Sequence, residues 1–262
     1  MKRKTPDFIE LLGDIMAAFM FLSKIPIPWE NFSEKPPDLT RSFWAFPLVG
    51  LILGSLSGII ALIFLISGFH SIISVIIGVC FGLIITGAIH EDGFAHSVDG
   101  LIEGEDNSEI IEIMRDNKIG TYGGLALILS LTIRVICLAS LAYESSWLMF
   151  VGFATSGTIG RSMIVFLRSM SDPIQDTGLS SLTERTEGGV LWSALGISFF
   201  SMIILLPFGI ALSGFLLCLI LTYGIRAIVE RKIGGITGDI LGATEQLSVL
   251  IFLIVFAGIY GL

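Results

Sequence analysis

Seven apolar runs, each long enough to cross a lipid bilayer, constrain this chain more than any other feature of its sequence. They lie at residues 44–67, 71–90, 122–142, 146–168, 190–212, 213–230 and 240–262. About 20 helical residues cross a hydrocarbon core of about 30 Å, and a composition with only 15% charged residues agrees with such helices. The sequence therefore predicts an all-α fold, a polytopic transmembrane helical bundle that forms a single integral membrane domain over residues 1–262.

The N-terminal segment predicts a helix of another kind. Residues 8–24 are apolar but contain Glu10 and Asp14, and Pro26 and Pro28 follow. Proline cannot continue a helix, and two carboxylates disfavour a full span. We expect an interfacial or re-entrant helix here rather than a full span.

The distribution of basic residues predicts the orientation. One set of connections contains Arg115, Lys118, Arg168, Arg185, Arg231 and Lys232, whereas the opposite connections at 67–71, 143–146 and 207–214 contain no Lys or Arg. Basic residues concentrate in cytoplasmic loops. We expect a multi-pass protein of the cell inner membrane with a cytoplasmic N-terminus and active face. The lipid bilayer is an expected partner, the net charge of −8 argues against nucleic acid, and a homo-oligomer is left open.

The segment HEDGFAHSVDG at residues 90–100 carries the strongest candidate for chemistry. Asp92, His96 and Asp99 have the spacing i, i+4 and i+7, which places them on one face of a helix that continues the preceding span. Ionisable residues at the end of a span are usually functional, and Mg²⁺ prefers oxygen ligands shared with substrate phosphates. The stripe predicts a metal site, with a polar network between helices as the alternative.

Three further segments contain candidates for binding phosphate or metal. Arg115, Asp116 and Lys118 precede a glycine-containing loop, which suits a diphosphate or close helix packing. Asp239 stands alone in GGITGDILGATEQ just before the last span, and Arg161 lies near the inner end of its span. For Arg161, a side chain that reaches toward the membrane surface is the alternative.

The remaining carboxylates after residue 100 fit a solvated amphipathic helix. Asp106 or Asn107 can cap it, while Ile110 and Met114 face inward and Glu109 faces water.

Five motifs together resemble the cobalamin synthase family, the adenosylcobinamide-GDP ribazoletransferases. They are KIPIP at 24–28, FPLVGLILG at 46–54, HEDGFAHSVDG at 90–100, EIMRDNKIGTYGG at 112–124 and GGITGDILGA at 234–243. They occur in the family's order and cover almost the whole chain. Three of them fall on the predicted cytoplasmic side.

This resemblance implies a Mg²⁺-dependent transferase of cobalamin biosynthesis. Such an enzyme joins adenosylcobinamide-GDP to α-ribazole or α-ribazole 5′-phosphate, and releases GMP with adenosylcobalamin or its 5′-phosphate. The matching positions imply catalytic roles for Asp92, Asp99, Arg115 and Asp116 and substrate binding by Lys118 and Asp239. They also imply metal ligation by Asp92, His96, Asp99 and Asp239. Arg161, which lies outside these motifs, is a substrate-binding candidate from its place near the inner end of its span.

One departure from the family pattern falls at His96, where the usual HxDGxADTxDG has an aspartate. Imidazole suits Zn²⁺, Mn²⁺ or Fe²⁺ better than Mg²⁺. Two alternatives from other classes are a CDP-alcohol phosphotransferase of lipid synthesis, and a secondary transporter whose acidic groups bind protons or cations.

Overall fold

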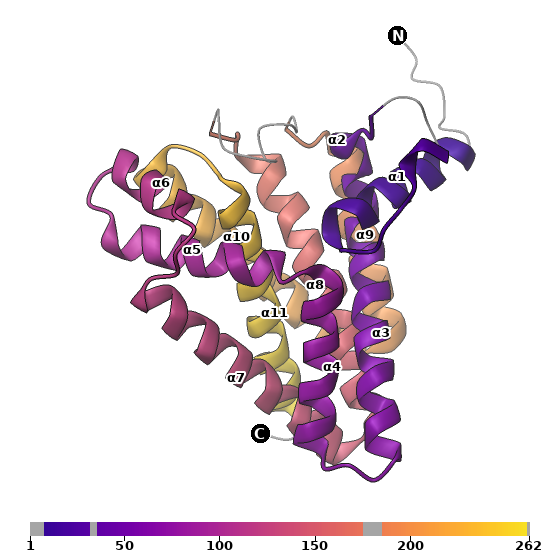
Figure 1. The fold of residues 1–262 in the computed structure, drawn as a ribbon. Coiled ribbons are helices and arrows are strands. Elements are labelled where there is room, and N and C mark those ends of the chain that lie inside the picture. The colour runs from indigo at the N-terminus through magenta and orange to yellow at the C-terminus, as the bar shows by residue number, and fades with distance from the viewer. Residues whose placement is uncertain (1–7, 32–35, 175–184, 261–262) are drawn as a thin grey trace.

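The computed structural model describes residues 8–31, 36–174 and 185–260, which form helices joined by short connections (Figure 1). In chain order the helices are α1 (Phe8–Leu22), α2 (Leu39–Ser42), α3 (Phe46–Ile66), α4 (Ser71–Thr86), α5 (Ile89–Glu103), α6 (Asn107–Arg115), α7 (Thr121–Glu144), α8 (Ser146–Met170), α9 (Gly188–Leu205), α10 (Phe208–Ile233) and α11 (Gly238–Tyr260). The 3₁₀ turns Trp29–Asn31 and Phe43–Ala45 flank α2. The predicted helical membrane bundle is confirmed.

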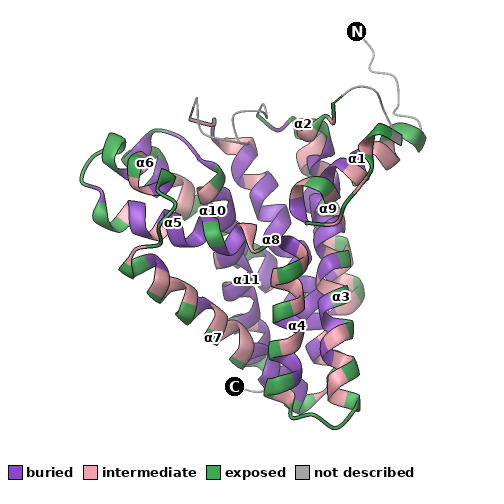
Figure 2. Cartoon of the chain, in the orientation of Figure 1, coloured by how far each residue is buried: buried purple, intermediate pink, exposed green. Residues whose placement is uncertain are grey.

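Helices α8 and α11 form the centre of the bundle, and the other long helices surround them (Figure 2). Small residues bring α3 and α8 together: a Cβ added at Gly50 or at Gly157 would overlap the backbone of the facing helix. Close backbone approach through small residues is a common way of packing helices in lipid. The centre is therefore held by fitted backbone surfaces as well as by apolar side chains.

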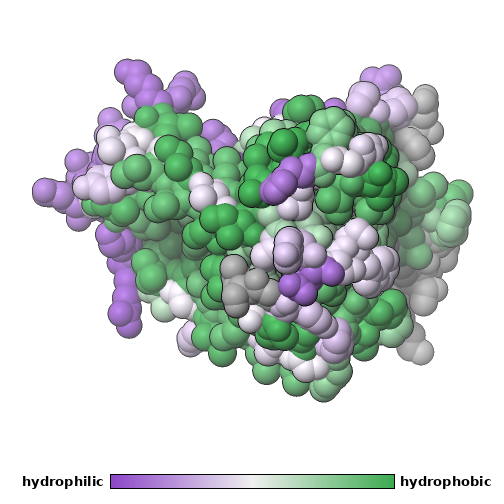
Figure 3. All heavy atoms as spheres, turned by 90° about the horizontal axis from the view of Figure 1, so that it is seen from below, coloured by the Kyte–Doolittle hydropathy of each residue, from purple (hydrophilic) through white to green (hydrophobic). Residues whose placement is uncertain are grey.

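The outer faces of the long helices are apolar. Exposed side chains on α4, α7 and α10 include Ile76, Ile84, Ile128, Leu129 and Ile220. Seen from the end opposite α6, the surface is mostly hydrophobic, and hydrophilic side chains project at the margin on the side of α5 and α6 (Figure 3). Six described helices are long and apolar enough to span a membrane, as expected of a multi-pass membrane protein.

The expected span at 71–90 ends early. Helix α4 stops at Thr86, and α5 leaves it at 87° after Gly87 and Ala88, whose φ angles are +68° and +53°. Glycine takes left-handed φ without strain, and Gly87 closes α4 because its N–H bonds the Ile84 carbonyl. With this bent pair counted as one span the described structure has up to seven, and otherwise six.

The expected boundary between the spans 190–212 and 213–230 is also wrong. Helix α9 ends at Leu205 and α10 begins at Phe208, because Pro207 stands at the N-cap of α10, where a missing N–H costs nothing. Apolar residues continue through this turn, so hydropathy alone does not show it. The last expected span, 240–262, corresponds to α11, and its final two residues lie outside the described part of the chain.

Both short helices expected outside the spans are present. Asp14 of α1 is buried and accepts hydrogen bonds from Arg41 Nε at 2.7 Å and Trp44 Nε1 at 3.1 Å, which fasten α1 to α2 and to the 3₁₀ turn that precedes α3. Asp106 caps α6, whose Ile110 and Met114 are buried. Hydrogen bonds from the Ser108 hydroxyl and the Glu109 N–H hold the pKa of Asp106 below its usual value.

Candidate active site

A cavity of about 650 Å³ lies at the end of the bundle where α1, α2 and α6 meet the turn between α4 and α5 and the start of α11. Its polar wall includes Lys24, His90, Arg115 and Asp239. Its apolar wall includes Met20, Phe21, Leu39, Phe43, Met114 and Leu241. A largely apolar pocket with a few convergent charged groups is the usual form of a small-molecule site.

Two glycines place Asp239 against α5. A Cβ on Gly93 would lie 2.9 Å from the Cα atom of Asp239, and one on Gly242 would lie 3.0 Å from the carbonyl oxygen of His90. The absence of side chains at Gly93 and Gly242 therefore lets α5 cross the beginning of α11 in backbone contact. This crossing sets Asp239 beside the face of α5 that carries Asp92.

Asp92, His96 and Asp239 form one group of ionisable side chains. The Asp92 side chain is 65% exposed, and its Oδ1 atom lies 3.5 Å from Nε2 of the buried His96. Asp239 interacts electrostatically with both. Apart from its own backbone N–H, its carboxylate has no hydrogen-bond donor among the residues that the structure describes, so it is available to a ligand.

Asp99, the third member of the predicted stripe, points elsewhere. It is 2% exposed, and its two oxygens accept the N–H groups of Gly120 and Gly123 at 2.7 Å each. It therefore closes the N-terminus of α7, where backbone N–H groups and the helix dipole favour an anion. The glycines of this loop admit the Asp99 carboxylate, since a Cβ on Gly120 would lie 2.6 Å from its Oδ1 atom.

The candidates Arg115, Asp116 and Lys118 lie at the end of α6 and in the loop that leads to α7. Arg115, the last residue of α6, lines the cavity, whereas the exposed Asp116 and Lys118 follow in the loop and do not line it. The Lys118 N–H bonds Asp116 Oδ1 at 3.2 Å, which fixes the local turn. Substrate binding by Lys118 and catalysis by Asp116 stay predictions.

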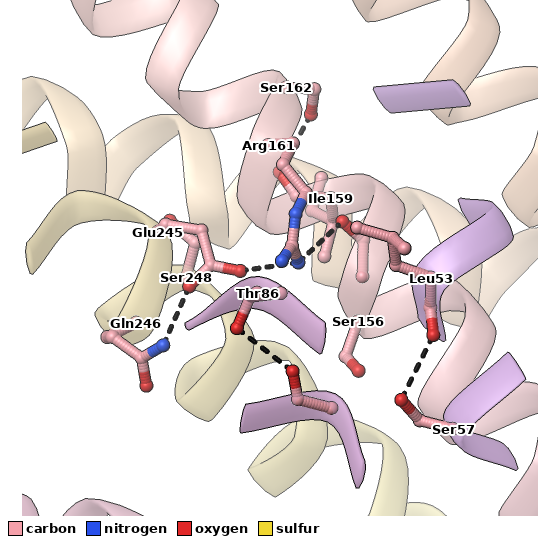
Figure 4. A network of polar contacts seen from close by, with 12 residues as sticks. Leu53, Ser57, Thr86, Ser156, Ile159, Arg161, Ser162, Glu245, Gln246 and Ser248 are labelled. Atoms are coloured by element: carbon pink, nitrogen blue, oxygen red, sulfur yellow. Dashed lines mark hydrogen bonds and ion pairs between the residues drawn. The ribbon is translucent and has the colours of Figure 1, made fainter. Parts of the chain in front are cut away.

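Arg161 belongs to a separate buried cluster in the bundle core (Figure 4). Its Nη1 atom donates to Glu245 Oε1 at 2.7 Å, and both residues are less than a tenth exposed. The network continues through Gln246, which donates to Glu245 and Glu91 and accepts from Arg134 at 2.7 Å. Arg134 in turn donates to Glu91 at 3.2 Å.

This network surrounds a second, smaller cavity of about 70 Å³, so Arg161 does not reach the large one. It joins α5, α7, α8 and α11, and two of these helices, α5 and α11, carry Asp92 and Asp239. Its two arginines and two glutamates balance in charge. The structure therefore gives the Arg161 guanidinium a partner from the protein, and contact with substrate stays a prediction.

Lys24 and His90 line the cavity, although their sequence positions did not single them out. His90 is buried at the start of α5, and the described structure shows no hydrogen bond to its ring. The available signals were the histidine that opens HEDG and the lysine that opens KIPIP. Neither signal identifies a cavity residue from the sequence alone, because only folding brings the two segments to one cavity.

The oxygen atoms present fit a Mg²⁺ ion shared with substrate. Across the described residues, no three histidine, cysteine or carboxylate side chains converge on one point. Mg²⁺ usually takes one or two carboxylates and fills its remaining positions with water and substrate phosphates. Asp92 is exposed, Asp239 lines the cavity, and the two interact electrostatically and have no arginine partner in the described structure, which matches that mode.

Comparisons with known proteins agree with the motifs. The family model described as Cobalamin-5-phosphate synthase matches residues 14–257. The adenosylcobinamide-GDP ribazoletransferase of Bradyrhizobium diazoefficiens is 33% identical over 259 residues, covering 97% of this chain and 96% of that protein. The enzyme of the same name from Klebsiella pneumoniae is 31% identical over 250 residues, covering 93% and 99%. No solved structure matches. With a family match across almost its entire length, the chain belongs to the cobalamin-5-phosphate synthase family.

Proposed function

We propose that this chain joins adenosylcobinamide-GDP to α-ribazole or α-ribazole 5′-phosphate in the 650 Å³ cavity, and releases GMP. Family membership makes the chain a transferase of cobamide nucleotide-loop assembly. It also decides against the lipid phosphotransferase and the transporter. The observation that supports this location is the Asp239 carboxylate, which has no donor from another described residue and shares the cavity wall with Arg115.

The reaction is a phosphoryl transfer in which one P–O bond forms and another breaks. A ribose hydroxyl of the ribazole attacks the phosphorus that carries the corrinoid, and its proton is lost. The bond from that phosphorus to the bridging oxygen breaks, and GMP leaves with both electrons of that bond. Positioning and charge stabilisation dominate such reactions. In this proposal Arg115, which lines the cavity, contacts phosphate oxygens, and the apolar wall limits the access of water.

We also propose that Mg²⁺ is required and that Asp92 and Asp239 hold it together with substrate phosphates. When bound, the ion neutralises diphosphate charge and stabilises the leaving group. His96, 3.5 Å from Asp92, orients that carboxylate or supplies a nitrogen ligand. We place this cavity on the cytoplasmic face of the inner membrane, because basic residues concentrate in the connections at this end.

Purified protein incubated with adenosylcobinamide-GDP, α-ribazole and Mg²⁺ tests the proposal, with cobamide and GMP separated by chromatography. We expect equimolar products, their loss on chelation with EDTA, and recovery on adding Mg²⁺. Absence of product with every divalent metal tried would refute the reaction. Full activity in EDTA would refute only the metal requirement.

A further inference from the structure

The KIPIP motif opens with Lys24, which follows α1 and lines the large cavity. The backbone of Lys24 is fixed, because its N–H donates to the Ile85 carbonyl at 2.7 Å. That bond ties the chain after α1 to the last turn of α4. Lys24 is therefore held at the bend that leads into α5, although this bend is distant from Lys24 in the sequence.

The side chain of Lys24 lies against Gly87. A Cβ added at Gly87 would overlap the Cε atom of Lys24 and would lie 2.8 Å from its Cγ atom. Gly87 therefore has two roles: its φ of +68° makes the bend, and its missing side chain leaves room for the aliphatic stem of Lys24. Lysine commonly packs its stem on a surface and extends its ammonium group beyond it.

The Lys24 ammonium group has no carboxylate partner among the described residues, in contrast to Arg41, Arg134, Arg161 and Arg226. It shares the cavity wall with Arg115 and Asp239. An unpaired, strongly hydrated cation beside an arginine is suited to phosphate oxygens, for which lysine acts as a point charge.

We infer that Lys24 is a further substrate-binding residue, whose ammonium group holds a substrate phosphate in the cavity. This inference rests on the proposed function for the identity of that substrate. Two phosphate sources share this chemistry, namely the diphosphate of adenosylcobinamide-GDP and the 5′-phosphate of phosphorylated ribazole.

Steady-state kinetics of Lys24→Gln tests the inference. One charge-assisted contact corresponds to a rise in KM of about 10- to 100-fold. If the diphosphate is the partner, KM for adenosylcobinamide-GDP rises with either ribazole as second substrate. If the 5′-phosphate is the partner, only KM for α-ribazole 5′-phosphate rises. Lys24→Arg should recover much of the loss because it keeps the charge.

Arg231→Gln is the matched control, because Arg231 is an exposed base at the same end of the bundle and does not line the cavity. It removes the same charge and should leave every KM unchanged. Unchanged KM values for all three substrates in Lys24→Gln would overturn the inference, as would equal effects of the two variants.

Direct titration separates this inference from the proposed reaction. GDP and inorganic phosphate are the probes, and wild type and Lys24→Gln are compared by calorimetry in detergent. We expect weaker binding of at least one probe in the variant. If the variant binds a probe more weakly but the wild-type protein makes no cobamide, the phosphate site at Lys24 is supported and the proposed reaction is refuted. Normal turnover with equal binding of both probes by both proteins would refute the Lys24 assignment alone.

Discussion

The bundle holds two groups of charged side chains, and they differ in whether those charges are paired. In the core network of Glu91, Arg134, Arg161, Glu245 and Gln246, each charged residue has a partner of opposite charge within 3.2 Å. In the large cavity, Lys24 and Asp239 have no such partner in the described structure.

The contrast separates a structural role from a binding role. A charge removed from water is expensive unless it is paired, so the core network is stable only as a complete set. In the cavity, Lys24 and Asp239 lack such a pairing in the described structure, which fits the proposed binding of phosphate and metal. The core network also fastens α5 to α11, which places Asp92 beside Asp239.

The largest effect is expected from breaking the core network with Arg161→Ala. The buried Glu245 would lose its charged partner, and we expect unfolding to become easier by about 3–5 kcal/mol. Thermal unfolding in detergent measures this loss. The double variant Arg161→Met with Glu245→Leu removes both charges and should recover most of the stability. A double variant as unstable as Arg161→Ala would show that charge pairing is not the cause.

Asp239→Asn should lower turnover rather than thermal stability, in contrast to Arg161→Ala. We expect turnover to fall about 100-fold, equivalent to about 2.7 kcal/mol, because a ligand of the proposed Mg²⁺ is weakened. Thermal stability should change little, since the one described hydrogen bond of the carboxylate is to its own backbone N–H, and the amide oxygen of Asn can still accept it. Glu103→Gln, at an exposed position near the end of α5, is the control and should keep full activity. A stability loss without a turnover loss would place Asp239 with the core network instead.

Gly93→Ala tests the contact that joins the two regions. The new Cβ would lie 2.9 Å from the Cα of Asp239 and would push α5 away from α11. Overpacking of this kind costs about 1–3 kcal/mol, and turnover should fall as Asp92 and Asp239 separate. Gly196→Ala on α9 is the control, because no atom lies within 4 Å of its added Cβ. Equal behaviour of the two variants would argue against a tight crossing.

The smallest effect is expected at the cap of α6, which supplies Arg115 to the cavity. The pKa of Asp106 is lowered in the folded protein, so its contribution is present above the unfolded value of about 3.8 and is lost as pH falls through the lowered value. Hydrogen exchange of the α6 amides should quicken in that range. Asp106→Asn keeps a capping side chain that does not titrate, and its α6 should lack this pH dependence.

Much of the fold was predictable from the sequence, because hydropathy and helix signals are local. The apolar runs located the long helices, and Asp106 located the cap of α6. The bend after Thr86 was missed, because left-handed φ angles at Gly87 and Ala88 leave no trace in hydropathy. The turn at Pro207 was misplaced for a related reason: apolar residues continue on both sides of it.

The candidate site was also predictable from the sequence only in part. Asp92, His96 and Asp99 do share one helix as predicted, but the spacing could not show that α7 would place two N–H groups on Asp99. Arg161 looked accessible because its partner, Glu245, is 84 residues away in the chain.

The sequence by itself determined a helical membrane protein, its family and the motifs that carry charge, since each depends on composition, period or local order. The tertiary structure alone decided which charges are paired and which face the cavity. Pairing depends on contacts between helices that are distant in sequence, and such contacts arise only when α5, α7, α8 and α11 pack together. Lys24 likewise gained its place at the cavity through contacts distant in sequence, namely the bond of its N–H to Ile85 of α4 and the contact of its side chain with Gly87.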